Sequence, residues 1–159
     1  MRIYLVQHGD ALEKDVDPDR PLSPKGLQDV ERVAAFLARQ GVILPYVWHS
    51  GKTRAAQTAA VLFAHAGAGG ECEFHPGLAP KDDPNRICRD LAKQSEDTAV
   101  VGHQPQLSLM AGRLLTGDDQ LQPIDFERGS VLCLKSSPDG TWRVAWMVTP
   151  QLLAGLPRT

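Results

Sequence analysis

The chain has 159 residues, a length suited to one domain with a substantial buried core. Apolar residues make up 42% and charged residues 23%, and the net charge of −2 argues against a nucleic-acid or membrane-surface partner. The three cysteines form no CxxC pair, and no apolar run is long enough for a signal-peptide core or a membrane span. We therefore expect residues 1–159 to form a single domain of a reduced, cytoplasmic protein.

The N-terminal part of the chain predicts a strand, a loop and a helix. Residues 2–7 contain a four-residue apolar run that indicates a buried strand, and the polar segment 13–20 indicates a loop. Ser23 as N-cap and Pro24 at the first helical position begin a helix with apolar residues at helical spacing. Gly41 is the residue type expected where this helix ends.

The middle of the chain predicts a second strand, a second helix and a third strand. The strand covers residues 46–49, and an alanine-rich helix follows at about 52–66. We expect the apolar side of this helix to carry Ala56, Ala59, Ala60 and Phe63. The glycine-rich stretch 67–70 predicts a short loop, and residues 72–75 predict the third strand.

The C-terminal part predicts two more helices, a fourth strand and a hairpin. Asp83-Pro84 begins a helix that ends near Leu91, residues 98–101 form the strand, and Pro105 begins the last helix. Two further strands, at 131–134 and 142–148, flank a turn-forming segment. Strands that alternate with helices before a hairpin predict a three-layer α/β/α sandwich on a mostly parallel sheet.

Two histidines follow predicted strands, and each is next to a glycine. His8 precedes Gly9, whose lack of a Cβ lets backbone amides approach whatever His8 touches, and His103 follows the fourth strand. Carboxyl ends of parallel strands meet at one edge of a sheet, where α/β proteins bind ligands. Arg54 in the first turn of the second helix and Arg20 at the end of the first loop are placed to join them. Together they predict a cationic pocket of the kind that a phosphoryl group requires.

Less specific interpretations of these residues stay open at this point. A single strand-end histidine is more often structural than catalytic, a single arginine is often a solvated helix residue, and Asp10 alone could be a turn former. The segment 51–53 resembles the end of a P-loop but lacks the glycine five residues earlier. A metal site built from His8, Asp10 and His103 is disfavoured because arginines are nearby. We therefore predict neither a metal nor another cofactor.

Four ordered motifs resemble those of the histidine phosphatase superfamily, which has the phosphoglycerate mutase-like fold. These motifs are VQHGDA at 6–11, DRPLSPKG at 19–26, SGKTRAAQT at 50–58 and VVGHQP at 100–105. The resemblance extends from residue 1 to about 150, and the short chain is most similar to the SixA-type phosphohistidine phosphatase branch. It implies a metal-independent phosphohydrolase that works through a phosphohistidine intermediate.

The resemblance also implies roles for individual residues. His8 corresponds to the nucleophile that takes the phosphoryl group, and His103 to the second histidine, which stabilises the charge of that group. Arg54 corresponds to the arginine that clamps phosphate oxygens, and Arg20 to an additional phosphate-side arginine.

The small members of the superfamily lack an inserted segment that brings a glutamate acid in the larger enzymes, and this chain has no room for it between residues 58 and 98. Expulsion of an alkoxide needs a proton donor, whereas a protonated imidazole can leave neutral. The absence of such a glutamate acid therefore favours P–N substrates over phosphate monoesters. Asp10 is the nearest candidate acid, and a structural turn residue is the alternative.

Position 7 departs from the family motif, which is Arg-His-Gly, because this chain has Gln7. An amide can donate a hydrogen bond to phosphate but has neither the charge nor the bidentate fork of a guanidinium. Three outcomes are open: Arg20 compensates, the enzyme is slow or prefers a differently charged substrate, or the chain binds phosphoryl groups without turnover.

These observations lead to one main hypothesis and two alternatives. The main hypothesis is a protein phosphohistidine phosphatase whose partner is a phosphorylated protein, and the resemblance suggests a histidine phosphotransfer domain. The alternatives are a regulatory module that binds phosphoryl groups, with Gln7 as the reason for weak turnover, and a phosphomonoesterase that acts on small phosphorylated substrates.

Overall fold

The computed structural model describes residues 1–156 and contains a six-stranded sheet. The strands are β1 (Arg2–Gln7), β2 (Leu44–His49), β3 (Gly67–Phe74), β4 (Thr98–Gly102), β5 (Val131–Ser136) and β6 (Trp142–Val148). Their order across the sheet is β3-β2-β4-β1-β5-β6. Strands β1 to β4 are parallel, whereas β5 runs antiparallel to both β1 and β6. The prediction of a mostly parallel sheet with an antiparallel C-terminal hairpin is confirmed.

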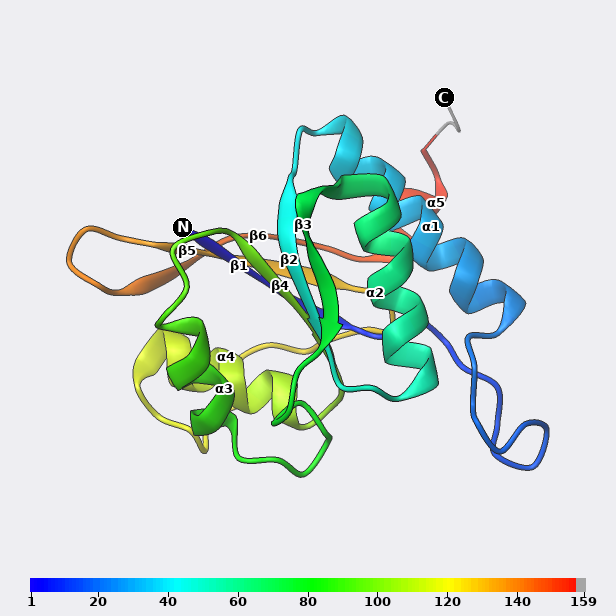
Figure 1. The fold of residues 1–159 in the computed structure, drawn as a ribbon, viewed down its shortest axis with the longest axis horizontal. Coiled ribbons are helices and arrows are strands. Elements are labelled where there is room, and N and C mark those ends of the chain that lie inside the picture. Colours follow the sequence, from blue (N-terminus) through cyan, green and yellow to red (C-terminus); the bar gives the residue numbers. More distant parts are fainter. Residues whose placement is uncertain (157–159) are drawn as a thin grey trace.

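Helices cover both faces of this sheet (Figure 1). They are α1 (Pro24–Arg39), α2 (Thr53–Ala66), α3 (Pro84–Leu91), α4 (Gln106–Thr116) and α5 (Pro150–Ala154). Helices α1 and α2 pack together on one face with α5 beside α1, and α3 packs against α4 on the other face. The predicted three-layer α/β/α sandwich is therefore confirmed.

The side chains of the central strand β1 alternate between two hydrophobic cores. Tyr4 and Val6 join the core under α1 and α2, whereas Ile3 and Leu5 join the core under α3 and α4. All four side chains are buried, as expected for a strand that is covered on both faces. Because β1 is also paired with β4 and β5 along its two edges, the residues that follow it begin from a rigid position.

Three predicted helix starts are confirmed, and side-chain caps mark those of α1 and α3. The Ser23 hydroxyl accepts a hydrogen bond from the Gly26 amide at 2.9 Å and caps α1. The Asp83 carboxylate caps α3 in the same way, and Pro105 directly precedes α4. Gly41 follows the end of α1 with a φ of +73°, a conformation that favours glycine.

The prediction of a loop at residues 67–70 is wrong, because β3 begins at Gly67, directly after α2. A Cβ atom at Gly70 would lie 1.7 Å from the carbonyl oxygen of Pro45. The glycine therefore lets the β3 backbone approach the beginning of β2 more closely than another residue would allow.

The predicted apolar side of α2 is only partly correct. Ala59 is buried, but Ala60 is exposed and Ala56 and Phe63 are only half-buried. The buried residues are Ala55, Thr58, Ala59, Leu62 and Ala66. The helix is therefore rotated from its expected orientation, because the polar Thr58 is buried next to the end of β1 and accepts a hydrogen bond there.

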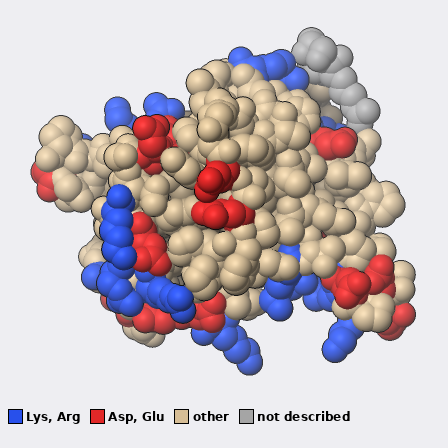
Figure 2. All heavy atoms as spheres, viewed as in Figure 1, with Lys and Arg blue, Asp and Glu red and all other residues tan. Residues whose placement is uncertain are grey.

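Helix α5 has no counterpart among the predicted elements, and the Thr149 hydroxyl caps it by accepting from the Leu152 amide. In residues 1–156, no helix is both long enough and apolar enough to cross a membrane. On the face shown in Figure 2, basic and acidic side chains of the described residues are interspersed over a surface that is largely uncharged.

Candidate active site

The two strand-end histidines meet at the carboxyl edge of the sheet, as predicted. Strands β1 and β4 are parallel neighbours, and Gln7 pairs with Gly102, so the residues that follow both strands lie side by side. The rings of His8 and His103 have centroids 4.9 Å apart. Both side chains are buried, with residue exposures of 8% for His8 and 3% for His103.

The hydrogen bonds of His8 define which of its nitrogens is free to react. Nδ1 lies 2.7 Å from the carbonyl oxygen of Gly9, and a carbonyl can only accept, so Nδ1 carries the proton. Nε2 accepts a hydrogen bond from Nε of Arg54 at 3.2 Å, which places a lone pair on Nε2. Burial, together with the charges of Arg54, Arg128 and Arg20, lowers the pKa of His8 to about 4. The imidazole is therefore neutral at pH 7, with an available lone pair.

His103 has a different partner. Its Nε2 lies 2.6 Å from the hydroxyl oxygen of Ser50, which follows β2. Burial, followed by the neighbouring His8 and then the charges of Arg54 and Lys52, lowers the pKa of His103 to about 3. His103 is thus also neutral at pH 7. Sequence analysis did not single out Ser50.

Helix α2 places the Arg54 guanidinium beside His8 from its first turn. One side chain of the same helix fixes this placement. The hydroxyl of Thr58 donates to the carbonyl oxygen of Arg54 at 2.8 Å and accepts from the amide of Gly9 at 3.1 Å. Thr58 therefore joins the start of α2 to the end of β1, so that nucleophile and guanidinium keep their relative positions.

The segment that follows His8 packs directly against the start of α1. A Cβ atom at Gly9 would lie 2.6 Å from Cγ2 of Val30, and one at Gly26 would lie 2.0 Å from the carbonyl oxygen of Asp10. The lack of a Cβ at Gly9 therefore serves the packing of two protein segments against each other, not the approach of a ligand. The amide of Gly9, which we expected near a bound ligand, donates to Thr58.

Arg20 and Gln7, the two remaining residues of the predicted phosphate site, border the histidines. Arg20 has a φ of +49° and donates from Nε to the carbonyl oxygen of Leu12 at 3.1 Å. Its charge lowers the pKa of both His8 and Arg54, which indicates a position close to them. The side-chain oxygen of Gln7 is buried and has no hydrogen-bond partner among the described residues.

Asp10 is held as a carboxylate by two partners. It accepts a hydrogen bond from the Ser23 hydroxyl at 2.7 Å and forms an ion pair with Arg128. The Ser23 bond, followed by Arg128, lowers the pKa of Asp10 despite partial burial. These contacts favour the turn-residue interpretation of Asp10 over that of a proton donor. Arg128 was not predicted, because no local pattern marks a residue so far along the chain as a neighbour of Asp10.

The site is therefore rich in guanidinium groups and contains two neutral imidazoles. In residues 1–156, no three His, Cys, Asp or Glu side chains are grouped so that they could hold a metal ion. Guanidinium groups provide several donors for the oxygens of a tetrahedral anion, and the free Nε2 of His8 provides an electron pair. The arrangement can bind an oxyanion and attack its central atom.

A model of the histidine phosphatase superfamily (branch 1) matches residues 3–80. The N-terminal half of the chain is therefore similar to this superfamily, as its motifs indicated. The chain is also 29% identical over 143 residues to an uncharacterised protein of Picosynechococcus sp. (strain PCC 7002), with 86% of each chain covered.

Solved structures show the same fold in several phosphatases. The protein histidine phosphatase SixA, complexed with tungstate, matches with a TM-score of 0.84 and 24% identity, and 96% of this chain and 99% of SixA are covered. An α-ribazole phosphatase from Shigella flexneri matches with a TM-score of 0.74 and 16% identity, with coverages of 94% and 97%. A phosphoserine phosphatase mutant from Entamoeba histolytica matches with a TM-score of 0.69 and 14% identity, with coverages of 94% and 98%. The chain therefore has the predicted phosphoglycerate mutase-like fold.

Proposed function

We propose that this chain is a metal-independent protein phosphohistidine phosphatase, built as a single domain and acting in the cytoplasm. The observation that carries the proposal is the state of His8. Its Nδ1 is held by the Gly9 carbonyl, while its Nε2 keeps a lone pair beside Arg54. A neutral imidazole that faces a guanidinium is suited to attack the phosphorus of an anion that the guanidinium binds.

The proposed reaction has two steps. In the first, the lone pair of His8 Nε2 forms a bond to phosphorus while the P–N bond of the substrate breaks. The substrate imidazole, protonated on its other nitrogen, takes that electron pair and leaves neutral. In the second, a water oxygen attacks phosphorus, the pair of the P–Nε2 bond returns to His8, and the proton of the water passes to solvent.

Arg54 and Arg20 would stabilise the oxygens of the transferring group in both steps. Arg54 must then exchange its hydrogen bond to His8 Nε2 for one to a phosphoryl oxygen. His103, 4.9 Å from His8 between ring centroids, would donate a hydrogen bond to the same group. The lowered pKa of Asp10 supports a P–N substrate, because a carboxylate cannot protonate an alkoxide leaving group.

The partner that we propose is a phosphorylated protein, such as a histidine phosphotransfer domain. SixA, the protein histidine phosphatase with a similar fold, supports this choice. The α-ribazole and phosphoserine phosphatases with the same fold support the alternative, a phosphomonoesterase for small substrates. The uncharged Gln7 supports a third possibility, a regulatory module that binds phosphoryl groups without turnover.

The decisive experiment compares a phosphohistidine peptide, phosphoramidate and phosphomonoesters as substrates and traps the intermediate by rapid acid-free quenching. We expect the P–N compounds to be hydrolysed fastest and an acid-labile phosphoryl group to appear on wild type but not on His8→Ala. His65→Ala, which removes an exposed histidine of α2, is the matched control. Faster hydrolysis of monoesters would favour the small-substrate alternative, and binding without hydrolysis would favour the regulatory module.

A further inference from the structure

The phosphoryl site lacks a positive charge directly before its nucleophile. Gln7 contributes only an amide, and its buried side-chain oxygen has no partner among the described residues. A bound phosphate dianion is best stabilised by several charged donors. Arg128 is a cation near His8 that the proposed function does not use.

Arg128 lies in the segment between α4 and β5, and this segment is hydrogen-bonded to the end of β1 through its backbone. The amide of Gly129 donates to the carbonyl oxygens of Gln7 at 3.0 Å and His8 at 3.1 Å. The amide of Gln7 in turn donates to the carbonyl oxygen of Ser130 at 3.2 Å. Arg128 is therefore one residue away from a direct backbone contact with the nucleophile.

The side chain of Arg128 is half-exposed, and its pair with Asp10 does not use all of its donors. Its Nη1 pairs with Asp10, and its side chain is 48% exposed. Its charge contributes to the lowered pKa of His8 and of Arg54. The contact with Asp10 leaves Nε and Nη2 as donors without a partner among residues 1–156.

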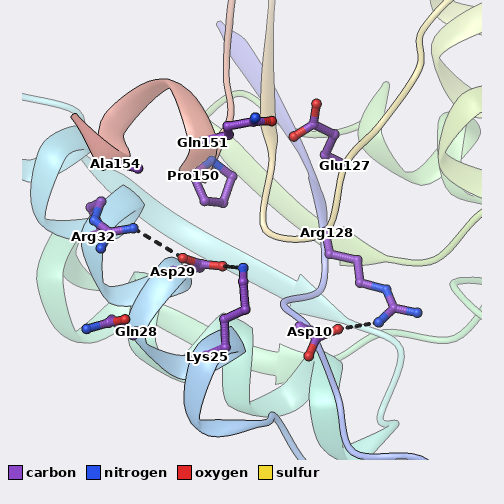
Figure 3. Close-up of a pocket in the computed structure, with 10 residues that line it drawn as sticks. All are labelled: Asp10, Lys25, Gln28, Asp29, Arg32, Glu127, Arg128, Pro150, Gln151 and Ala154. Carbon is purple, nitrogen blue, oxygen red and sulfur yellow. Dashed lines mark hydrogen bonds and ion pairs between the residues drawn. The ribbon is translucent and has the colours of Figure 1, made fainter. Parts of the chain in front are cut away.

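Figure 3 shows the surroundings of this pair. Asp10 and Arg128 stand at one edge of a cavity of about 630 Å³ that is also bordered by α1 and α5. Across the cavity, Asp29 is paired with Lys25 and Arg32. His8, Arg54 and His103 are not among the residues that line this cavity, so it lies on the side of the Asp10–Arg128 pair that faces α1 and α5.

We infer that Arg128 is a phosphate-binding residue of this site, exchanging its contact with Asp10 for oxygens of the phosphoryl group and providing the charge that position 7 lacks. The inference rests on the proposed function for the identity of the ligand. Two observations carry it: the backbone hydrogen bonds that join Gly129 to Gln7 and His8, and the donors that the half-exposed Arg128 keeps beside its pair with Asp10.

The test measures the dissociation constant of inorganic phosphate by titration calorimetry. We expect Arg128→Gln to weaken phosphate binding about tenfold, because a charged hydrogen bond is replaced by a neutral one, and Arg128→Lys to weaken it less. Adding Gln7→Arg to Arg128→Gln should restore most of the lost affinity. Arg32→Gln removes the same charge from the other side of the cavity and should leave the dissociation constant unchanged.

A purely structural role for Arg128 would act through Asp10, and Asp10→Asn separates the two explanations. If Arg128 binds phosphate, Asp10→Asn frees the guanidinium and leaves phosphate binding unchanged or tighter. If Asp10→Asn weakens binding as much as Arg128→Gln does, the inference is overturned. It is also overturned if Arg128→Gln binds phosphate like wild type, or if wild type does not bind phosphate at all. Failure of the proposed function would appear separately, as normal phosphate binding without hydrolysis of any phosphorylated substrate.

Discussion

The ends of β1 and β4 present the same residue type in two different settings. His8 and His103 are both buried and neutral, but His8 is restrained by a carbonyl and a guanidinium, whereas His103 is restrained by the Ser50 hydroxyl. A carbonyl can only accept and a guanidinium can only donate, so the tautomer of His8 is fixed. A hydroxyl can do both, so His103 can gain or shift a proton without losing its partner. The difference suits His8 to nucleophilic attack and His103 to stabilising a charge that appears only during transfer.

The glycines beside these histidines also differ in how tightly they are packed, and the one next to His8 is the more tightly packed. A Cβ atom at Gly9 would overlap Val30, whereas one at Gly102 would find its nearest atoms at 3.5 Å, an ordinary contact. The His8 end is therefore closely packed against a helix, and the His103 end retains some room. A rigid nucleophile and a more adaptable partner are what the proposed mechanism needs.

The largest effect should separate the two histidines. We expect His8→Ala to lower the rate of hydrolysis by at least about 10⁴-fold and to abolish the phosphoenzyme, because the attacking atom is lost. His103→Ala should lower the rate by about 10² to 10³-fold, since electrostatic stabilisation is lost, but should still form a phosphoenzyme slowly. Single-turnover kinetics with a phosphohistidine peptide measures both. Equal loss of the phosphoenzyme in both variants would contradict the assigned difference.

The glycine pair should show the next largest effect, in stability. Gly9→Ala forces a Cβ atom to within 2.6 Å of Val30 and should destabilise the fold by about 1–3 kcal/mol, the usual range for overpacking. Gly102→Ala should change stability by less than about 1 kcal/mol, because it introduces no such overlap. Urea denaturation followed by circular dichroism compares the two. A larger loss for Gly102→Ala would reverse our view of which end is tightly packed.

The pH dependence of stability should reflect both histidines. Their pKa values fall from 6.5 to about 4 for His8 and to about 3 for His103, so below pH 6.5 the unfolded chain binds more protons than the folded one. The contribution of the two histidines to the free energy of unfolding should therefore be fully present above pH 6.5. It should fall as the pH decreases toward 4, by up to about 1.4 kcal/mol per pH unit for each histidine. Urea midpoints between pH 7 and 4.5 measure this slope. His8→Asn and His103→Asn should each flatten it, and an unchanged slope in both would refute the burial argument; His65→Asn is the control.

The smallest effect should come from Ser50. Ser50→Ala removes the hydroxyl that restrains His103 and should lower kcat by about three- to tenfold, with little change in phosphate affinity. Ser50→Thr keeps the hydroxyl and should restore most of the activity. A shift of the His103 ring signals in NMR spectra of Ser50→Ala would show that the effect passes through the imidazole. A rate equal to that of wild type would mean that the hydroxyl does not position His103.

Much of this architecture follows from local sequence patterns. The Ser23-Pro24 and Asp83-Pro84 pairs predict helix starts correctly because a cap and its helix are adjacent in the chain. The meeting of His8 and His103 was also predictable, because parallel strands end at a common edge. The sequence pattern and the strand topology were sufficient to predict the interactions that are local in the chain or imposed by the sheet.

The features that could not be predicted depend on contacts between distant segments. Arg128 meets Asp10, and Thr58 meets Gly9, across long stretches of chain that leave no periodic signal. The glycines at 67–70 suggested a loop, although Gly70 serves the close approach of two strands. Composition alone does not distinguish a flexible glycine from one that is needed for packing.

The strand order has a consequence for how the chain matures during synthesis. Strand β1 pairs with β4 and β5, and no residue of β2 pairs with it directly in the described part of the chain. Strand β1 is made before the other strands of this sheet, so it stays without an edge partner until residues 98–102 have emerged, and its second edge is covered only after residue 131. His8 is made before the other proposed reacting groups, but the strands that border β1 are made much later. A growing or truncated chain should therefore carry the nucleophile without the site that activates it.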